Sequence, residues 1–250
     1  MGRGKSGLGG GGGGAKSAFS DRDTGDFRQM TDAEEFDYLI RQQTTDEQQA
    51  AFDKYTNPNT EAGSLYNFSQ NLNYAVATGQ PLTPEQQKAW DEINGAMHNI
   101  GYNAELLRYD HGDTVNEILR QIGVSGRAET MTPSQLKKQL AGVSYSDSRV
   151  LSTSVNGFKN SSDPSVFTTR QFKFTYRTNA GAKGVMPGVG KTPMRGSGKS
   201  RGDDFGEMLL SPENKYKIVD VKYSGGKARR KGGSKRYLTE RQIEIIVEVD

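Results

Sequence analysis

The chain has 250 residues, of which 32% are hydrophobic and 31 are glycine, so it can form one sizeable domain with appendages or two small domains. It contains no cysteine and only two histidines, which excludes disulfides and a thiolate metal site, and we expect no bound metal. No apolar run approaches the roughly 20 residues of a membrane span, and no secretion signal follows Met1. We therefore expect a protein of the cytoplasm, either of its own cell or of a host.

Charge divides the chain into two unequal halves. Residues 1–150 hold 14 Lys/Arg and 20 Asp/Glu, a balance of −6, whereas residues 151–250 hold 19 Lys/Arg and 10 Asp/Glu, a balance of +9. A basic half is typical of a protein that meets an anionic partner such as a nucleotide, a nucleic acid or an acidic protein face, although a solvated surface has the same composition.

The first 30 residues are rich in glycine and have no apolar periodicity. Six consecutive glycines at 9–14 would lose much backbone entropy on folding without side chains to pack. We predict a disordered tail over residues 1–30 and a folded domain over residues 31–250.

Residues 31–143 are expected to form a mainly helical lobe. Helix starts are marked by a threonine followed three residues later by Glu or Gln, the pattern of a capping box. These pairs are Thr31/Glu34, Thr45/Gln48, Thr83/Gln86, Thr114/Glu117 and Thr132/Gln135. The expected helices are 32–43, 46–55, 61–78, 84–98, 114–122 and 133–141.

Residues 144–250 are expected to be mainly β-structure. Alternating segments rich in β-branched and aromatic residues predict strands at 150–151, 171–177, 207–210, 216–223 and 242–249. Two Gly-rich basic loops are predicted between them, at 180–203 and 224–236. Helices followed by strands indicate an α+β fold.

Three polar groups stand in apolar, strand-like settings far apart in the chain. Arg108 follows Leu106-Leu107, the segment Ser152-Thr153-Ser154 follows an apolar pair, and Glu207 precedes Met208-Leu209-Leu210. Taken singly, each has an ordinary structural explanation: a surface or ion-paired arginine, hydroxyls that satisfy nearby backbone, and a salt-bridged glutamate. Together they offer a two-pronged phosphate donor, a hydroxyl that can orient a carboxylate, and a partly desolvated carboxylate.

This order of motifs resembles the Arg-Ser-Glu class of ADP-ribosyltransferases, which includes clostridial Rho-modifying exoenzymes and actin-modifying toxins. Upstream, 52–56 (FDKYT) and 71–74 (NLNY) look like the family's two helical lead-in motifs. Downstream, 209–212 (LLSP) and 216–219 (YKIV) are similar to its strand, turn and strand after the glutamate. The resemblance covers about residues 46–250.

The resemblance implies an N-terminal helical lobe packed on a split mixed and antiparallel β-sandwich, with NAD bound as substrate in a cleft between the sheets. It implies that Arg108 contacts the NAD phosphates, that Ser152 orients Glu207, and that Glu207 binds the ribose 2′-hydroxyl beside the nicotinamide. Arg108, Ser152 and Glu207 are thus the predicted catalytic residues. The other predicted NAD contacts are Tyr109, Thr153, Ser154, Arg170 and a nicotinamide-stacking ring from Phe158 or Phe167.

The sequence departs from the family pattern at two places. Many members carry Gln or Glu two residues before the catalytic glutamate, where this chain has Phe205, and Asp204 is the alternative acceptor-side candidate. Tyr109-Asp110 stands where the family usually has a glycine after the arginine. The acceptor is left open by the first departure, and NAD hydrolysis without efficient transfer is an alternative to transfer.

A second hypothesis of a different class is a non-enzymatic nucleic-acid-binding or virion-associated protein. Residues 222–237 are dense in Lys and Arg and have tyrosines near both ends, a composition suited to neutralising phosphates. The two hypotheses are compatible. The main expectation is a monomeric mono-ADP-ribosyltransferase, phage-encoded or an intracellular effector, that modifies a protein in preference to a nucleic acid.

Overall fold

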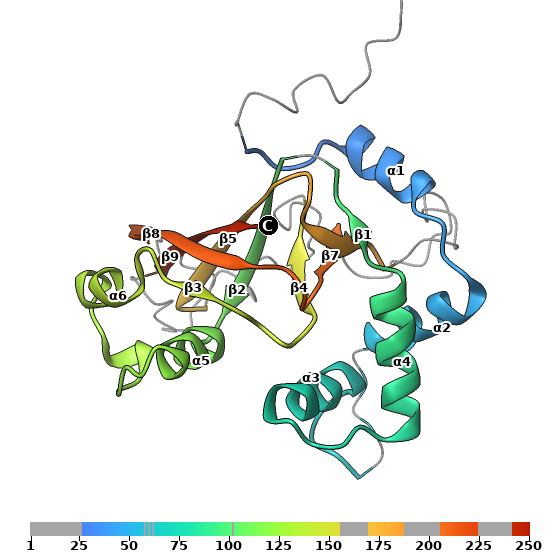
Figure 1. Ribbon diagram of the computed structural model, residues 1–250, viewed down its shortest axis with the longest axis horizontal. Coiled ribbons are helices and arrows are strands. Elements are labelled where there is room, and N and C mark those ends of the chain that lie inside the picture. The colour runs from blue at the N-terminus through green and yellow to red at the C-terminus, as the bar shows by residue number, and fades with distance from the viewer. Residues whose placement is uncertain are drawn as a thin grey trace, which may run out of the picture.

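The structure is a computed structural model that describes residues 27–57, 59, 61, 63–101, 103–155, 170–187, 206–224 and 242–250. The chain begins with helices and continues mainly with strands (Figure 1). Its helices in chain order are α1 (Asp32–Arg41), α2 (Asp46–Tyr55), α3 (Phe68–Thr78), α4 (Pro84–Gly95), α5 (Asp113–Gln121), the 3₁₀ turn η1 (Ala128–Thr130) and α6 (Pro133–Leu140).

Local capping chemistry sets most of the helix starts. Complete capping boxes begin α1, α2, α4 and α6 at Thr31, Thr45, Thr83 and Thr132, which confirms four of the predicted pairs. The fifth prediction is wrong, because α5 is capped at Gly112 and Thr114 lies inside its first turn. The helix expected from residue 61 begins at residue 68 instead, where Asn67 and Gln70 form a capping box that was not predicted.

The described strands form one mixed sheet of nine. They are β1 (His98–Asn99), β2 (Ala104–Asp110), β3 (Ser144–Tyr145), β4 (Leu151–Ser154), β5 (Phe172–Thr178), β6 (Lys183–Val185), β7 (Glu207–Leu210), β8 (Tyr216–Ser224) and β9 (Gln242–Val249). Their order is β1-β6-β7-β4-β2-β5-β9-β8-β3, with β5 and β9 parallel and the other pairs antiparallel. This order confirms the predicted α+β class.

The sheet has two halves that meet at a narrow junction. The small half is β1-β6-β7-β4, and the large half is β2-β5-β9-β8-β3. β2 pairs with β5 along its whole length, from Ala104 to Asp110, but its pairing with β4 is a single register position, Leu107 opposite Ser154. The hydrogen-bonded order is thus continuous, and the sheet is narrowest between β4 and β2.

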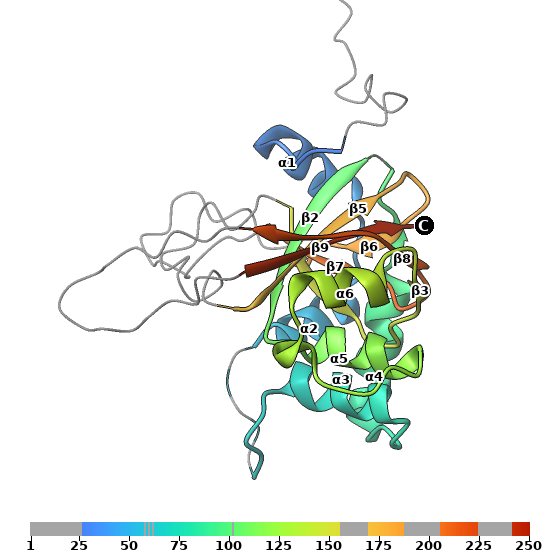
Figure 2. The same ribbon diagram turned by 90° about the vertical axis from the view of Figure 1, so that its left-hand side faces the viewer.

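The two faces of the small half pack against different parts of the molecule. Leu151 and Met208 join the large core that also contains Phe174 and Val247 of the large half. Val150 and Leu209 join a second core made with α2, α3 and α4. Figure 1 shows these three helices together below the small half, with α5 and α6 beside the large half, and Figure 2 shows the sheet between α1 and the other helices.

Two predicted boundaries need correction. Residues 27–30 belong to the folded part, because the N–H of Glu105 donates to the carbonyl of Arg28 and the N–H of Met30 donates to the carbonyl of Val155. The segment 180–203 is not all loop, since β6 lies within it and pairs with β7. Residues 1–26, 188–203 and 225–236 of the predicted tail and basic loops lie outside the described residues.

Candidate functional site

Arg108 lies on β2 at the junction of the two halves. Its Nη1 donates a hydrogen bond of 2.9 Å to the backbone carbonyl of Ser152 on β4, and its Nη2 is 3.7 Å from Oδ2 of Asp110. Its Nε is buried and has no hydrogen-bond partner within the described part of the chain. A buried guanidinium N–H without an acceptor is costly, so this donor is suited to a ligand oxygen.

Ser152 and Glu207 meet across the pairing of β4 and β7. Ser154 is opposite Glu207 in the register and Ser152 is opposite Leu209, so Ser152 and Glu207 are diagonal neighbours on one face. The hydroxyl of Ser152 donates to Oε1 of Glu207 at 2.5 Å. The contact that the family resemblance implied between these two residues is therefore present.

The environment of Glu207 disfavours its ionised form. Burial raises the pKa of this carboxyl above its ordinary value, and the Ser152 hydrogen bond and the charge of Arg108 oppose the shift without cancelling it. A carboxylate in such a setting gains from a ligand hydroxyl or from a developing positive charge.

Tyr55 and Asn73 bring the helical lobe to the same site. Tyr55 ends α2 and donates its hydroxyl to the carbonyl of Val150 at 3.2 Å, while Asn73 of α3 donates Nδ2 to the Tyr55 hydroxyl at 2.8 Å. Burial raises the pKa of Tyr55, and the Glu207 carboxylate adds to this shift. Both residues lie in the motifs that resemble the family's helical lead-in, and the sequence alone did not mark them as site residues.

Asp110 ends β2 and caps α5. Its Oδ1 accepts the N–H groups of Gly112 at 2.6 Å and Thr114 at 3.3 Å, and its Oδ2 accepts the Thr114 hydroxyl at 2.9 Å. Burial raises the pKa of Asp110, but the charge of Arg108 and these hydrogen bonds outweigh burial and hold the pKa below its usual value. Gly112 has φ of +117°, and a Cβ there would meet Glu129 and Phe172, so the turn needs glycine.

A second buried ion pair continues from this cap. Arg149 pairs with Asp147 through Nη2 at 2.6 Å and Nε at 2.8 Å, and its Nη2 also donates to the Thr114 hydroxyl at 3.3 Å. Asp147 is 4% exposed. The capped first turn of α5 thus lies between two arginine–aspartate pairs.

Other predicted NAD contacts lie around the junction with different orientations. Thr153 points away from Ser152 and donates to the carbonyl of Met208 at 2.8 Å, while Ser154 is fully buried on the Ser152 face. Tyr109 alternates with Arg108, which puts its ring on the opposite face of β2, and Glu244 adds to the burial that raises its pKa. Arg170 lies before β5, donates to the carbonyl of Tyr109 at 2.8 Å, and has a pKa lowered by burial and by Arg108.

Several predicted residues lie outside the described residues. They are Phe158, Phe167, Asp204, Phe205 and all but the first part of 222–237. Lys222 and Tyr223, which begin that basic stretch, are exposed at the end of β8.

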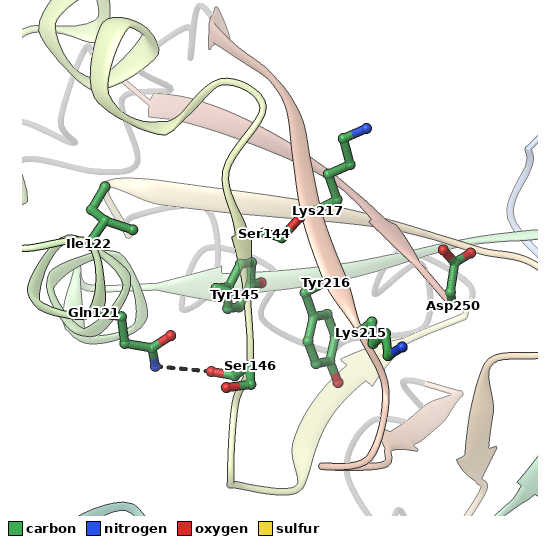
Figure 3. A pocket seen from close by; sticks show the side chains of 9 residues that line it. All are labelled: Gln121, Ile122, Ser144, Tyr145, Ser146, Lys215, Tyr216, Lys217 and Asp250. Carbon is green, nitrogen blue, oxygen red and sulfur yellow. Dashed lines mark hydrogen bonds between the residues drawn. The ribbon is translucent and has the colours of Figure 1, made fainter.

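A cavity of about 490 Å³ lies away from this junction (Figure 3). Its walls come from the end of α5, from β3 and β8, and from the C-terminal residue, and include Gln121, Tyr145, Lys215, Tyr216, Lys217 and Asp250. None of the predicted site residues lines it. Among the described residues, no group of three or more His, Asp or Glu side chains is placed to hold a metal ion, and no described helix has the length and apolar character needed to cross a membrane.

Comparison with known proteins identifies the fold. The chain is similar to the Clostridium limosum C3 exoenzyme, with 17% identity, a TM-score of 0.58, and coverage of 90% of this chain and 98% of that one. Plx2a, an ADP-ribosyltransferase toxin from Paenibacillus larvae, gives 15% identity, a TM-score of 0.57, and coverage of 87% and 92%. The ADP-ribosylating toxin BECa of C. perfringens, solved with NADH, gives 14% identity, a TM-score of 0.58, and coverage of 87% and 46%.

The protein therefore has the fold of ADP-ribosyltransferase toxins, as the sequence resemblance implied. Neither models of protein families nor the sequences of curated proteins give a match. Because the identity to the solved structures is below a fifth, the likeness establishes the fold, and the activity must be argued from the site.

Proposed function

We propose that the protein is a mono-ADP-ribosyltransferase that cleaves the bond between nicotinamide and ribose in NAD and transfers ADP-ribose to a protein acceptor. The observation that carries the proposal is the hydrogen bond from Ser152 to Glu207, beside Arg108, at the junction of the two sheet halves. A guanidinium that fits phosphate oxygens and a carboxylate that fits a cationic ribose lie together there.

In this proposal the glycosidic bond breaks and nicotinamide leaves with the bonding electron pair. The ribose becomes oxocarbenium-like, and the Glu207 carboxylate stabilises the positive charge that develops only in that state. Arg108 holds the NAD phosphates, and Ser152 keeps Glu207 oriented. The acceptor then bonds to the anomeric carbon through a nucleophilic atom and loses its proton, whereas water in its place gives hydrolysis.

The fit of NAD to these residues rests on an unsatisfied donor of Arg108 and on the raised pKa of Glu207. Arg108 Nε is a buried donor without a partner in the described ranges, and the Glu207 carboxyl has a raised pKa because burial exceeds the compensation from Ser152 and Arg108. A ligand with anionic oxygens near one and a hydroxyl near the other would satisfy both.

The test is incubation of the protein with NAD labelled in its adenylate part, together with a cell extract that supplies acceptors. Protein-bound label reports transfer, and released nicotinamide reports transfer and hydrolysis together. Glu207→Gln should lower both by on the order of 10²–10³-fold. The control is Glu105→Gln. Glu105 is on the same strand as Arg108, and its partly exposed carboxylate is paired with Arg177 of β5.

Each outcome has a separate meaning. Label in protein that disappears in Glu207→Gln and persists in Glu105→Gln supports the transferase. Nicotinamide release without protein-bound label supports NAD hydrolysis. Equal nicotinamide release by the wild type and Glu207→Gln, or none from either, would refute the proposed chemistry.

A further inference from the structure

We propose that Asp110 is a positioning residue for Arg108, holding the guanidinium in the orientation that meets the NAD phosphates while Asp110 itself is fixed by the first turn of α5. This inference rests on the proposed function and assigns a role to a residue next to the predicted arginine motif.

Asp110 is fixed in place by its own hydrogen bonds. It is 5% exposed and accepts from two backbone N–H groups and one hydroxyl of the α5 turn. Backbone donors at a helix start do not change conformation independently of the helix. The carboxylate is therefore held rigidly and can fix the orientation of a neighbouring cation.

Arg108 is held on two sides by groups of the protein. Nη1 donates to the Ser152 carbonyl, and Nη2 is 3.7 Å from Asp110 Oδ2, a separation at which attraction is electrostatic rather than a hydrogen bond. A guanidinium has five N–H donors, so these contacts fix its plane and leave donors for a ligand. Fixing a long side chain before binding lowers the entropy cost of binding.

The negative charge of Asp110 and its positioning role have opposite expected effects on NAD affinity. A carboxylate near the NAD phosphates repels them, so its neutralisation should strengthen NAD binding if charge were the whole effect. If Asp110 positions Arg108, its neutralisation should weaken NAD binding instead. The sign of the change therefore distinguishes the two effects.

Asp110→Asn is the informative variant. An asparagine oxygen can still cap the helix, but an amide NH₂ group cannot hold the Arg108 guanidinium. We expect the Kd and KM for NAD to rise about tenfold, because Arg108 loses the charge that orients it, with kcat within about threefold.

Asp147→Asn is the matched control. Asp147 is equally buried and is paired with an arginine in the same network, but its partner is Arg149 rather than Arg108. We expect its Kd for NAD to stay within about twofold of wild type. Thr114→Val is a second test that keeps the backbone cap and removes one donor to Asp110, and it should raise Kd about threefold.

A double-mutant cycle of Arg108→Met and Asp110→Asn, read by the urea midpoint of unfolding, tests the contact without any ligand. The proposal expects the two changes to be non-additive. Additive midpoints, or unchanged or tighter NAD binding by Asp110→Asn, would overturn it. A wild type that binds no NAD would refute the proposed function, and the cycle alone would then decide whether Asp110 holds Arg108.

Discussion

Arg108 interacts with two carboxyls, the half-buried Glu207 and the buried Asp110, whose environments shift their pKa values in opposite directions. Glu207 begins β7, and burial raises its pKa despite Ser152 and Arg108. Asp110 ends β2, and its pKa is lowered because Arg108 and the donors of the α5 turn outweigh burial. A carboxyl whose pKa is lowered by several protein donors supports the site, whereas one whose pKa is raised by burial is suited to act on a ligand.

The difference follows from what comes next in the chain. After Asp110 the backbone turns into a helix, whose first N–H groups need acceptors. After Glu207 the backbone continues as a buried strand, whose N–H groups are used in pairing with β4 and β6. The strand therefore supplies Glu207 with fewer free donors than the helix start supplies to Asp110.

The largest loss of activity should come from removing Arg108, the cation that both carboxyls share. Arg108→Met should lower kcat/KM for NAD by about 10²-fold or more, because it removes the phosphate donor and leaves the buried Asp110 carboxylate without its arginine. The measurement is initial-rate kinetics with NAD in varied concentration. A decrease of less than about fivefold would place the phosphates elsewhere.

Ser152→Ala should have a smaller effect confined to the Glu207 side. We expect kcat to fall about tenfold, because the carboxylate loses the hydroxyl that orients it. The Ser152 hydrogen bond lowers the pKa of Glu207, so its loss raises that pKa further. The acidic limb of the profile of kcat against pH should therefore move to higher pH, and a limb that stays in place or moves to lower pH would contradict the assignment.

The two carboxyls should also contribute oppositely to stability. The raised pKa of Glu207 means that the folded state binds its proton more tightly than the unfolded state, so stability falls as pH rises through the ordinary value of 4.5 toward the folded pKa. Asp110 stabilises the fold above its ordinary pKa of 3.8, and this contribution is lost as pH falls through its lower folded pKa.

Urea unfolding of both variants measures this difference. At pH 7, Glu207→Gln should be at least as stable as wild type, and Asp110→Asn should be less stable. The deficit of Asp110→Asn should shrink in strong acid, below the folded pKa of Asp110. A Glu207→Gln variant that is less stable than wild type at pH 7 would show that the protein satisfies this carboxylate.

The smallest effect is expected at a hydroxyl on the other face of the same strand. Thr153→Val removes the hydrogen bond to the Met208 carbonyl, which should lower the free energy of unfolding by about 1 kcal/mol. NAD turnover should stay within about twofold, because Thr153 points away from Ser152. A large loss of turnover without loss of stability would show that both faces of β4 act on the substrate.

Local patterns in the sequence predicted much of this structure. Four capping boxes gave their helix starts because the Thr and Glu or Gln pair acts within one turn. Glu207 and Ser152 were marked by their position at apolar strands. The Asn67–Gln70 box of α3 was readable in the same way and was overlooked.

The remainder depends on contacts between residues far apart in the chain. Tyr55 reaches the carbonyl of Val150, 95 positions away, and no local pattern indicates such a bond. Thr114 suited a capping box, but the carboxylate of Asp110, at the end of a strand, accepts hydrogen bonds from both the N–H and the hydroxyl of Thr114. The short strand β6 forms because β1 and β7 pair with it on either side.

The most direct test of the account is the rate of nicotinamide release from NAD by the wild type and by Glu207→Gln, at equal folded fraction. The account predicts that the variant still binds NAD and releases nicotinamide on the order of 10²–10³-fold more slowly. Release within about threefold of wild type would contradict the assignment of Glu207 as the group that stabilises the ribose cation.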